Sequence, residues 1–267
     1  MRSENREFGT AEAGGGDPLV LAVETTTVLL GVAVVSKGRV LYERSLVKPW
    51  VHSAALLPMC LEGLARSGVS PKDLSAIAVS SGPGSFTGLR IGFATAQGLS
   101  RAVGAVIVPV PTFDVLLEGC ASYPAVALVQ GRAKGQTVTA LYLEDSGSPG
   151  VSRRFREVQP PAPRSMEAFA SALVDAGVPR VWVGGDAASE FAAYCNSQDG
   201  ITKCLRVEPV SETELLPSPA LVGLVGSRMY EAGKWVKVEE ALPMYYRKSS
   251  AEAQAEEQSA EEGAHER

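Results

Sequence analysis

The sequence predicts an α/β protein built from two copies of one unit. Three observations indicate this: short apolar runs of strand length, two segments in which apolar or small residues recur at helical spacing, and a second half that repeats the order of elements more weakly. The 267 residues suffice for two modest domains, and 45% hydrophobic against 21% charged residues allows a core to be buried. The duplication rests on the order of elements, because no sequence repeat is visible.

The first half reads as β-β-β-α-β-α-β. Its first strand is the apolar run Leu19-Val20-Leu21-Ala22-Val23, and Ser36-Lys37-Gly38 makes a turn between the next two strands. A helix begins near Ser53, carries leucines at helical spacing and ends at Gly68. The remaining elements are strands at 29–35, 40–46, 77–79 and 105–110, and a second helix at about 87–101.

The second half repeats this order in a degraded form, after a break near 111–123. Its expected strands are 126–129, 137–143 and 181–183, and its expected helices are 166–176, 187–195 and 220–232. Two copies of one unit account for the length without long inserted loops. We therefore expect an N-terminal subdomain at 18–111 and a C-terminal subdomain at 112–248.

The two ends of the chain differ in composition from the body. Residues 1–17 are charged and contain three consecutive glycines, so we expect a disordered leader. Residues 249–267 hold six Glu and one Arg, which predicts a solvated acidic tail. The net charge is −5; without this tail the body has 24 bases and 24 acids. A neutral body argues against a strongly basic nucleic-acid-binding face.

Several classes of protein are disfavoured by what the sequence contains. No apolar run approaches the roughly 18 residues that a membrane helix needs, and no signal-peptide core is present, so we expect a cytoplasmic protein. Cys60, Cys120, Cys195 and Cys204 form no C-x-x-C pair, which is typical of buried or idle thiols in a reducing compartment. With only His52 and His265 in the chain, neither a zinc site nor a histidine-based catalytic triad is expected.

The densest motif lies between a strand and a helix, from Ser80 to Arg90. Free backbone N–H groups and the helix dipole suit such a turn to phosphate. The spacing fits neither a Walker A loop, which needs G-K-[S/T], nor a Rossmann turn, since Gly82, Gly84 and Gly88 are one residue too far apart. The alternative is a tight turn followed by a helix that Ser85 or Thr87 caps.

The helix after this turn has a face of small residues, Gly88, Gly92 and Ala96, which Thr95 widens. Each glycine inside a helix costs about 1 kcal/mol relative to Ala, a cost that is tolerable where two backbones approach closely. The partner could be the preceding helix or a helix of another protein. The leucine-rich face of the preceding helix could join the same bundle; its residues are Leu56, Leu57, Leu61 and Leu64.

Two further strand ends carry polar groups. Glu24-Thr25-Thr26-Thr27 places an acid and hydroxyls at a hairpin turn, a layout that holds Mg-nucleotide in sugar kinases and actin-like proteins, although strand ends often carry Thr. Glu24 and Thr25 are therefore weak candidates for cofactor binding. At Val183-Gly184-Gly185-Asp186 a second strand leads into a glycine turn, where Asp186 is expected to cap the next helix.

These motifs together resemble the TsaB (YeaZ) family, the dimerisation subunit of the bacterial machinery that makes threonylcarbamoyladenosine in tRNA. The resemblance extends from about 19 to 247. Its motifs are Leu21-Ala22-Val23-Glu24-Thr25-Thr26-Thr27, His52-Ser53 with Leu56-Leu57-Pro58, Ser81-Gly82-Pro83-Gly84-Ser85-Phe86-Thr87-Gly88-Leu89-Arg90-Ile91-Gly92, Ala94-Thr95-Ala96-Gln97-Gly98-Leu99 and the closing Ala241-Leu242-Pro243-Met244-Tyr245-Tyr246-Arg247. The Gly-Pro-Gly-Ser-Phe-Thr-Gly-x-Arg-x-Gly stretch is shared in part with the catalytic paralogue TsaD.

The resemblance implies a duplicated actin-like ATPase fold (ASKHA, ribonuclease H-like) with two βββαβαβ-type halves, the second degenerate. It also implies a non-catalytic subunit that pairs through a helical bundle with a TsaD-type subunit, the enzyme of threonylcarbamoyl transfer. The expected partner-interface residues are Leu56, Leu57, Leu61, Leu64, Gly88, Leu89, Gly92, Phe93 and Ala96. The turn that aims the second helix comprises Gly82, Pro83, Gly84, Thr87 and Arg90. Arg90 is expected to pair with a carboxylate, either in the fold or across the interface.

The same resemblance implies that this chain needs no cofactor, and that ATP enters the complex through partners that include a TsaE-type ATPase. Contact with tRNA would be indirect, and a homodimer is possible. One usable histidine cannot reproduce the two-histidine metal site of TsaD. Two departures disfavour nucleotide hydrolysis: the first strand ends in Glu24 where the family usually has Asp, and Gln130-Gly131-Arg132 replaces Asp-Ala-Arg, although Tyr142 ends the next strand as in the family.

Two other functions stay open from the residues. One is an actin-like kinase or hydrolase that binds ATP between its halves, which would need a pair of carboxylates at the cleft. The other is a scaffold that forms a homodimer through the same two helices.

Overall fold

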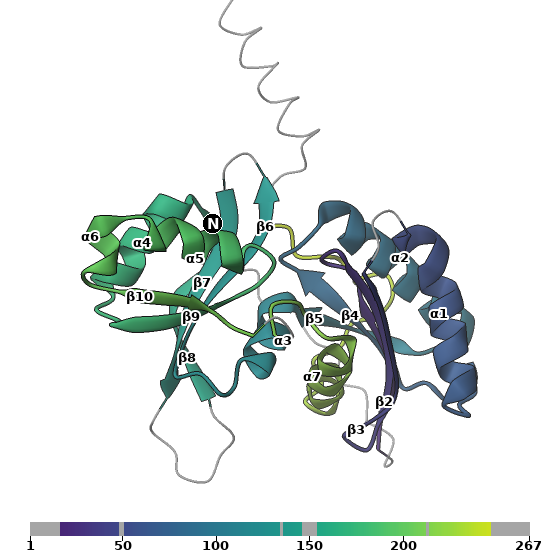
Figure 1. The fold of residues 1–267 in the computed structure, drawn as a ribbon. Coiled ribbons are helices and arrows are strands. Elements are labelled where there is room, and N and C mark those ends of the chain that lie inside the picture. Colours follow the sequence, from purple (N-terminus) through teal and green to yellow (C-terminus); the bar gives the residue numbers. More distant parts are fainter. Residues whose placement is uncertain (1–16, 48–50, 134–135, 146–153, 212–213, 247–267) are drawn as a thin grey trace, which may run out of the picture.

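The computed structural model describes residues 17–47, 51–133, 136–145, 154–211 and 214–246. It contains two five-stranded mixed sheets that lie beside one another, each covered by helices (Figure 1). The expected leader, the acidic tail, Arg247 and His265 lie outside the described residues.

The first sheet has the strand order β3-β2-β1-β4-β5. Strands β1 and β2 and strands β2 and β3 pair antiparallel, and β1 pairs parallel with β4, which pairs parallel with β5. The central strands read as nearly unbroken apolar runs because both of their faces are covered. The bounds are β1 Leu19–Glu24, β2 Leu29–Ser36, β3 Arg39–Val47, β4 Ala76–Gly82 and β5 Val106–Pro111.

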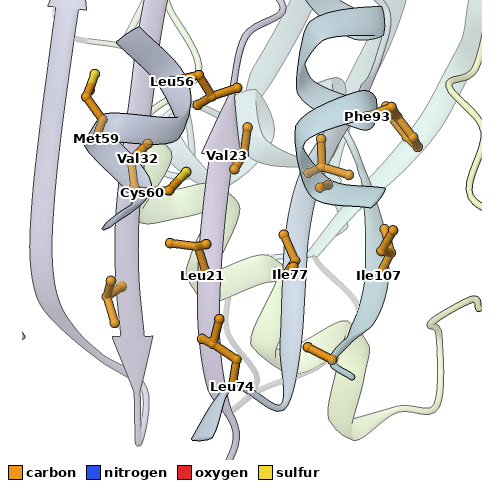
Figure 2. Close-up of a cluster of buried hydrophobic side chains, with 14 of the residues drawn as sticks. Leu21, Val23, Val32, Leu56, Met59, Cys60, Leu74, Ile77, Phe93 and Ile107 are labelled. Carbon is orange, nitrogen blue, oxygen red and sulfur yellow. The ribbon is translucent and has the colours of Figure 1, made fainter. Parts of the chain in front are cut away.

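Two helices cover one face of this sheet: α1, His52–Arg66, and α2, Phe86–Val103. A short 3-10 turn, η1 (Pro71–Asp73), leads from α1 into β4. Figure 2 shows the core that results, in which strand residues such as Leu21 and Ile77 meet Leu56 of α1 and Phe93 of α2. The two helices and the strands before and after them follow the predicted order.

The second sheet has the order β10-β9-β6-β7-β8. The helices α4 (Met166–Asp175), α5 (Ala188–Asn196) and α6 (Asp199–Thr202) lie over one face, and α3 (Thr112–Gly119) packs on the other. The bounds of the strands are β6 Ala125–Ala133, β7 Gln136–Asp145, β8 Arg154–Arg164, β9 Arg180–Gly184 and β10 Arg206–Pro209. Placing β6 on β1 and β9 on β4 makes the two strand orders identical, which confirms the prediction of two halves of one topology.

The second half contains elements that the sequence prediction lacks. The segment that becomes β8 contains Pro160, Pro161 and Pro163, which argues against a strand, yet β8 lies at the edge of the sheet, where prolines are tolerated. The short helix α3 occupies the expected break between the halves. The four-residue strand β10 is too short to show a period of its own.

The last helix, α7 (Pro219–Glu231), packs against β1, β2, β4 and β5 of the first sheet. Gly223 and Gly226 bring it close, since a Cβ at either would lie 2.5 Å from Val35 or Ala78 respectively. After α7 the chain stays on the first half, where Val236 and Ile107 exchange backbone hydrogen bonds of 3.1 and 2.9 Å. Residues 219–246, which the sequence prediction placed in the C-terminal subdomain, therefore pack on the first half instead.

None of the helices in the described part of the chain is long and apolar enough to cross a membrane.

Candidate functional site

The hairpin turn that follows β1 is organised by a fully buried carboxylate, Glu24. One oxygen, Oε1, accepts hydrogen bonds from the backbone N–H and the hydroxyl of Thr26, at 2.6 and 2.5 Å. The other, Oε2, accepts from the hydroxyl of Ser80 at the end of β4. Burial raises the pKa of Glu24 to about 7, against the lowering effect of these hydrogen bonds.

The next two residues, Thr25 and Thr26, hold the start of α2. The Thr25 hydroxyl donates to the carbonyl oxygen of Gly88 at 2.8 Å, and the carbonyl oxygen of Thr26 accepts from the N–H of Ser85 at 2.7 Å. The weak cofactor candidates Glu24 and Thr25 thus make hydrogen bonds inside the fold.

The small residues of α2 serve this contact. A Cβ at Gly88 would overlap the carbonyl oxygen of Thr25, and one at Gly92 would lie 2.5 Å from the Thr25 hydroxyl. A Cβ at Gly84 would overlap Thr26. The structure therefore corrects the interpretation that the glycines admit a partner helix: they admit the hairpin of the same chain, and a bulky side chain at Gly92 would damage the fold.

The turn before α2 contains the tight glycine turn that the sequence predicts, but its helix cap is Ser85. Gly82 has φ +115° and lies so close to the closing segment that a Cβ would be 2.6 Å from the carbonyl oxygen of Met244. Pro83 follows a cis peptide bond, and Gly84 is required by the close approach of Thr26, since its φ is not in the left-handed region. Ser85, with its Oγ 3.1 Å from the Gly88 N–H, caps the helix in place of Thr87.

Most of the residues assigned to a partner interface belong to the core of this chain. The buried members of that set are Leu56, Leu64, Gly88, Leu89, Gly92, Phe93 and Ala96. Four of them, Leu56, Leu64, Phe93 and Ala96, lie in the core between the two helices and the first sheet, where Figure 2 labels Leu56 and Phe93. Gly88 and Gly92 face Thr25, and Leu89 is buried. The burial of these seven within the chain contradicts the prediction that they meet a partner. Leucines that recur at helical spacing indicate one buried face, but the spacing does not separate the buried leucines from those one position away.

Two of the predicted leucines remain exposed: Leu57 with 45% and Leu61 with 50% of its surface accessible. They lie one turn apart on the outer side of α1, beside α2, whose outer side carries the exposed small residues Ala94 and Gly98. We call Leu57, Leu61, Ala94 and Gly98 the docking face. The docking face is apolar, and its two residues on α2 have small side chains. Both properties would allow a second pair of helices to pack closely against it.

A stack of three side chains lies at the N-terminal end of α2. The Arg90 guanidinium sits 4.1 Å from the centre of the Phe86 ring, and the Phe86 and Tyr245 rings are 4.7 Å apart. Arg90 is exposed and makes this cation–π contact, and the described ion pairs of the chain include none with Arg90. A carboxylate partner across an interface stays a prediction.

Tyr245 belongs to residues 236–246, the closing segment, which sequence reasoning assigned no structural role. Its Met244 N–H donates to the carbonyl oxygen of Ser81 at 2.7 Å, and the Gln97 side chain of α2 donates to the carbonyl oxygen of Ala241 at 2.9 Å. The only sequence signal was the resemblance of 241–247 to the family's closing motif.

The equivalent strand end in the second half has a different set of groups. The fully buried Gln130 accepts through Oε1 from the N–H of Asp186 at 3.1 Å. Asp186 accepts from the N–H of Gly131 at 2.7 Å and does not cap α5, whose preceding residue Ala187 makes no side-chain cap. The prediction of an Asp186 cap is wrong, because the carboxylate instead joins the ends of β6 and β9.

Metal and thiol chemistry have few candidate groups. The described ranges contain no cluster of three or more His, Cys, Asp or Glu side chains able to hold a metal ion. Burial raises the pKa of Cys60 and Cys120 to about 12 and of Cys195 to about 11, so these thiols stay protonated. The hairpin after β1 lies against the backbone of Gly84 and Gly88. A phosphate loop would hold its ligand at this place. These residues do not fit a nucleotide at this turn.

Comparison with known proteins supports the resemblance. A family model described as "TsaD: tRNA N6-adenosine threonylcarbamoyltransferase" matches residues 50–146. The tRNA threonylcarbamoyladenosine biosynthesis protein TsaB of Escherichia coli (strain K12) is 29% identical over 239 residues, which cover 87% of this chain and 96% of that protein. The TsaB protein of Haemophilus influenzae is 33% identical over 99 residues, 37% of this chain and 42% of that protein.

A solved structure agrees over the same length. The crystal structure of an uncharacterized Pseudomonas aeruginosa protein with similarity to peptidase YeaZ has a TM-score of 0.67 and 26% sequence identity, and the match covers 86% of this chain and 100% of that one. The nearly complete match to TsaB of E. coli, the TsaD-type segment and this structural agreement lead to one conclusion. Over most of its length the chain is similar to the TsaB (YeaZ) proteins.

Proposed function

We propose that this chain is a non-catalytic subunit in the biosynthesis of threonylcarbamoyladenosine in tRNA, and that it binds and activates a TsaD-type threonylcarbamoyltransferase. The docking face is the surface that makes this contact. The observation that carries the proposal is the pair of exposed leucines, Leu57 and Leu61, on a helix pair whose other leucines are buried or partly buried.

The segment that matches the TsaD model supports this choice of surface. Residues 50–146 include both α1 and α2, so a TsaD-type protein is expected to carry a related helix pair. Two related surfaces can pack about an approximate two-fold axis, as identical ones do in symmetric dimers. Such packing would bury Leu57 and Leu61 between four helices.

The roles that we assign to this chain and to its partners follow from the side chains at the ends of β1 and β6. Both carboxylate oxygens of Glu24 accept hydrogen bonds within the fold, and the equivalent position in the second half is Gln130, which has no carboxylate. We therefore assign threonylcarbamoyl transfer to the TsaD-type partner, ATP use to partners that include a TsaE-type ATPase, and an indirect role to this chain in tRNA recognition.

Co-purification tests the proposal. The tagged chain, co-expressed with the TsaD-type subunit of the same organism, should retain it, and Leu61→Asp should not. The matched control is Leu41→Asp, because Leu41 on β3 is 47% exposed, nearly the same fraction as Leu61, and lies outside the docking face. Retention of the partner by both variants would contradict the assignment of the surface.

The same variant addresses a homodimer. If isolated chains pair through the docking face, light scattering should show a dimer that Leu61→Asp converts to a monomer while Leu41→Asp does not. The TsaD-type subunit should then compete with the second copy for one surface.

A further inference from the structure

Glu24 is an unusual carboxylate for its position. It is fully buried, and the described ion pairs include none with Glu24. Its ligands are two hydroxyls and one backbone N–H, contributed by Thr26 and Ser80. A buried carboxylate without a cation is costly in its charged form, even when its oxygens are hydrogen-bonded.

The network can accept a proton without losing a contact. Both donors of Thr26 point to Oε1, so that oxygen is satisfied in either state. The partner of Oε2 is the Ser80 hydroxyl, which can donate to a carboxylate or accept from a carboxylic acid by rotation about its C–O bond. Glu24 can therefore keep its hydrogen bonds in both the neutral and the charged form. Only the charged form leaves a buried charge without a counter-ion.

The hairpin that Glu24 fixes is joined to both helices of the first half. Thr25 and Thr26 bond to Gly88 and Ser85 of α2, as described above. On the other side, Nε2 of His52 at the start of α1 lies 3.2 Å from the carbonyl oxygen of Thr27. A change in the protonation of Glu24 can thus act on the N-terminal ends of α1 and α2 through three hydrogen-bonded contacts.

The groups that face Glu24 are mostly uncharged. Its neighbour on β2 is Gly31, β4 contributes Ser80, and α2 approaches the hairpin through Gly84 and Gly88. The titratable side chain that touches the same hairpin is His52. Burial is the largest influence on the Glu24 pKa, which it raises to about 7.

We infer that Glu24 is a protonation-sensitive anchor: its neutral form holds the hairpin and the N-terminal ends of α1 and α2 in place, and its charged form loosens them. The anchor itself does not depend on the proposed function. Its effect on partner binding does rest on that function, because the docking face is built on the same two helices.

The sign of the pH dependence follows from the raised pKa. In the unfolded chain Glu24 titrates near 4.5 and in the fold near 7, so the fold binds the extra proton between these values. Stabilisation is complete below pH 4.5 and is lost as the pH rises through 7. The folding equilibrium constant should fall by a factor on the order of 100 across this range because of this one group.

The experiment compares the full-length protein with Glu24→Gln from pH 5 to pH 8.5. Urea unfolding should show stability that decreases with pH in the wild type and a clearly shallower dependence in Glu24→Gln, which keeps the shape without the charge. The exposed Glu239→Gln is the control and should behave like the wild type. Amide exchange at Thr26, Ser85 and Gly88, corrected for the intrinsic rate, should accelerate at pH 8.5 in the wild type only. Equal pH dependence in Glu24→Gln and wild type would overturn the inference.

If Glu24→Gln fails to fold, Ser80→Ala gives the same test. The hydrogen bond from the Ser80 hydroxyl to Oε2 lowers the pKa of Glu24, so its removal should raise that pKa. The midpoint of the stability loss should therefore move to a higher pH than in the wild type. An unchanged midpoint would contradict the anchor.

Partner binding is measured separately. Affinity for the TsaD-type subunit should weaken several-fold between pH 6 and pH 8.5 in the wild type and less in Glu24→Gln. Equal weakening would refute the link to docking, whereas absence of binding at every pH would contradict the proposed function while the unfolding and exchange results still decide the anchor.

Discussion

The hydroxyl of Thr25 donates a hydrogen bond of 2.8 Å to the carbonyl oxygen of Gly88, which joins the hairpin after β1 to the first turns of α2. This contact explains why the helix carries glycine there: the two backbones are too close for a Cβ. The close approach fixes α2 on the sheet, and with α1 it leaves a narrow apolar strip exposed.

The first prediction concerns Gly88→Ala. The added methyl group would overlap the Thr25 carbonyl oxygen, a backbone atom that cannot move without displacing β1, so we expect a loss of about 3 kcal/mol or more, or failure to fold. Urea unfolding monitored by circular dichroism measures it.

The matched control is Gly98→Ala in the same helix. A Cβ there meets nothing within 4 Å, so the change should stabilise the protein by up to about 1 kcal/mol through helix propensity alone. Similar effects of the two variants would contradict the close approach at Gly88.

The stack at the start of α2 gives a second prediction. Because Arg90 is exposed over the Phe86 ring, Arg90→Ala should cost only about 0.5–1 kcal/mol, less than the loss of a buried ion pair would. In a Phe86→Leu background the same change should cost almost nothing, since the ring is gone. A thermal-unfolding double-mutant cycle without coupling would show that the contact does not stabilise the fold.

The third prediction concerns α7. In Gly223→Val the new side chain would press on Val35 and Ala22, so we expect a loss of about 1–3 kcal/mol. Leu224→Val introduces the same β-branched side chain at a half-buried position one residue along and should cost less. Equal losses measured in urea would contradict the close packing of α7 on the first sheet at Gly223.

Much of the fold could be predicted because the first half carries strong local signals. The apolar run at Leu19–Val23 fits a strand covered on both faces, and the glycine-rich turn before α2 marks a strand-to-helix junction. β8 could not be predicted, because its prolines are acceptable only at a sheet edge and a sequence does not show where the edge lies.

The candidate site was predicted less well, for a related reason. The spacing of Leu56, Leu57, Leu61 and Leu64 marks an apolar helix, but only the packing of α1 on the sheet separates the buried Leu56 and Leu64 from the exposed Leu57 and Leu61. The small face of α2 indicated a close approach correctly, but nothing local identified Thr25, 63 residues away from Gly88, as its partner. The role of the closing segment likewise depends on contacts far apart in the chain.

We propose that the exposed leucines of α1, Leu57 and Leu61, bind a TsaD-type subunit. The most direct test is the dissociation constant of that complex for Leu61→Asp against Leu41→Asp, measured by calorimetry with both variants shown to be folded. We expect Leu61→Asp to weaken binding by at least about 30-fold, the loss of a buried anchor of about 2 kcal/mol or more, and Leu41→Asp to change it less than about 3-fold. Equal dissociation constants for the two variants would contradict the assignment of the docking face.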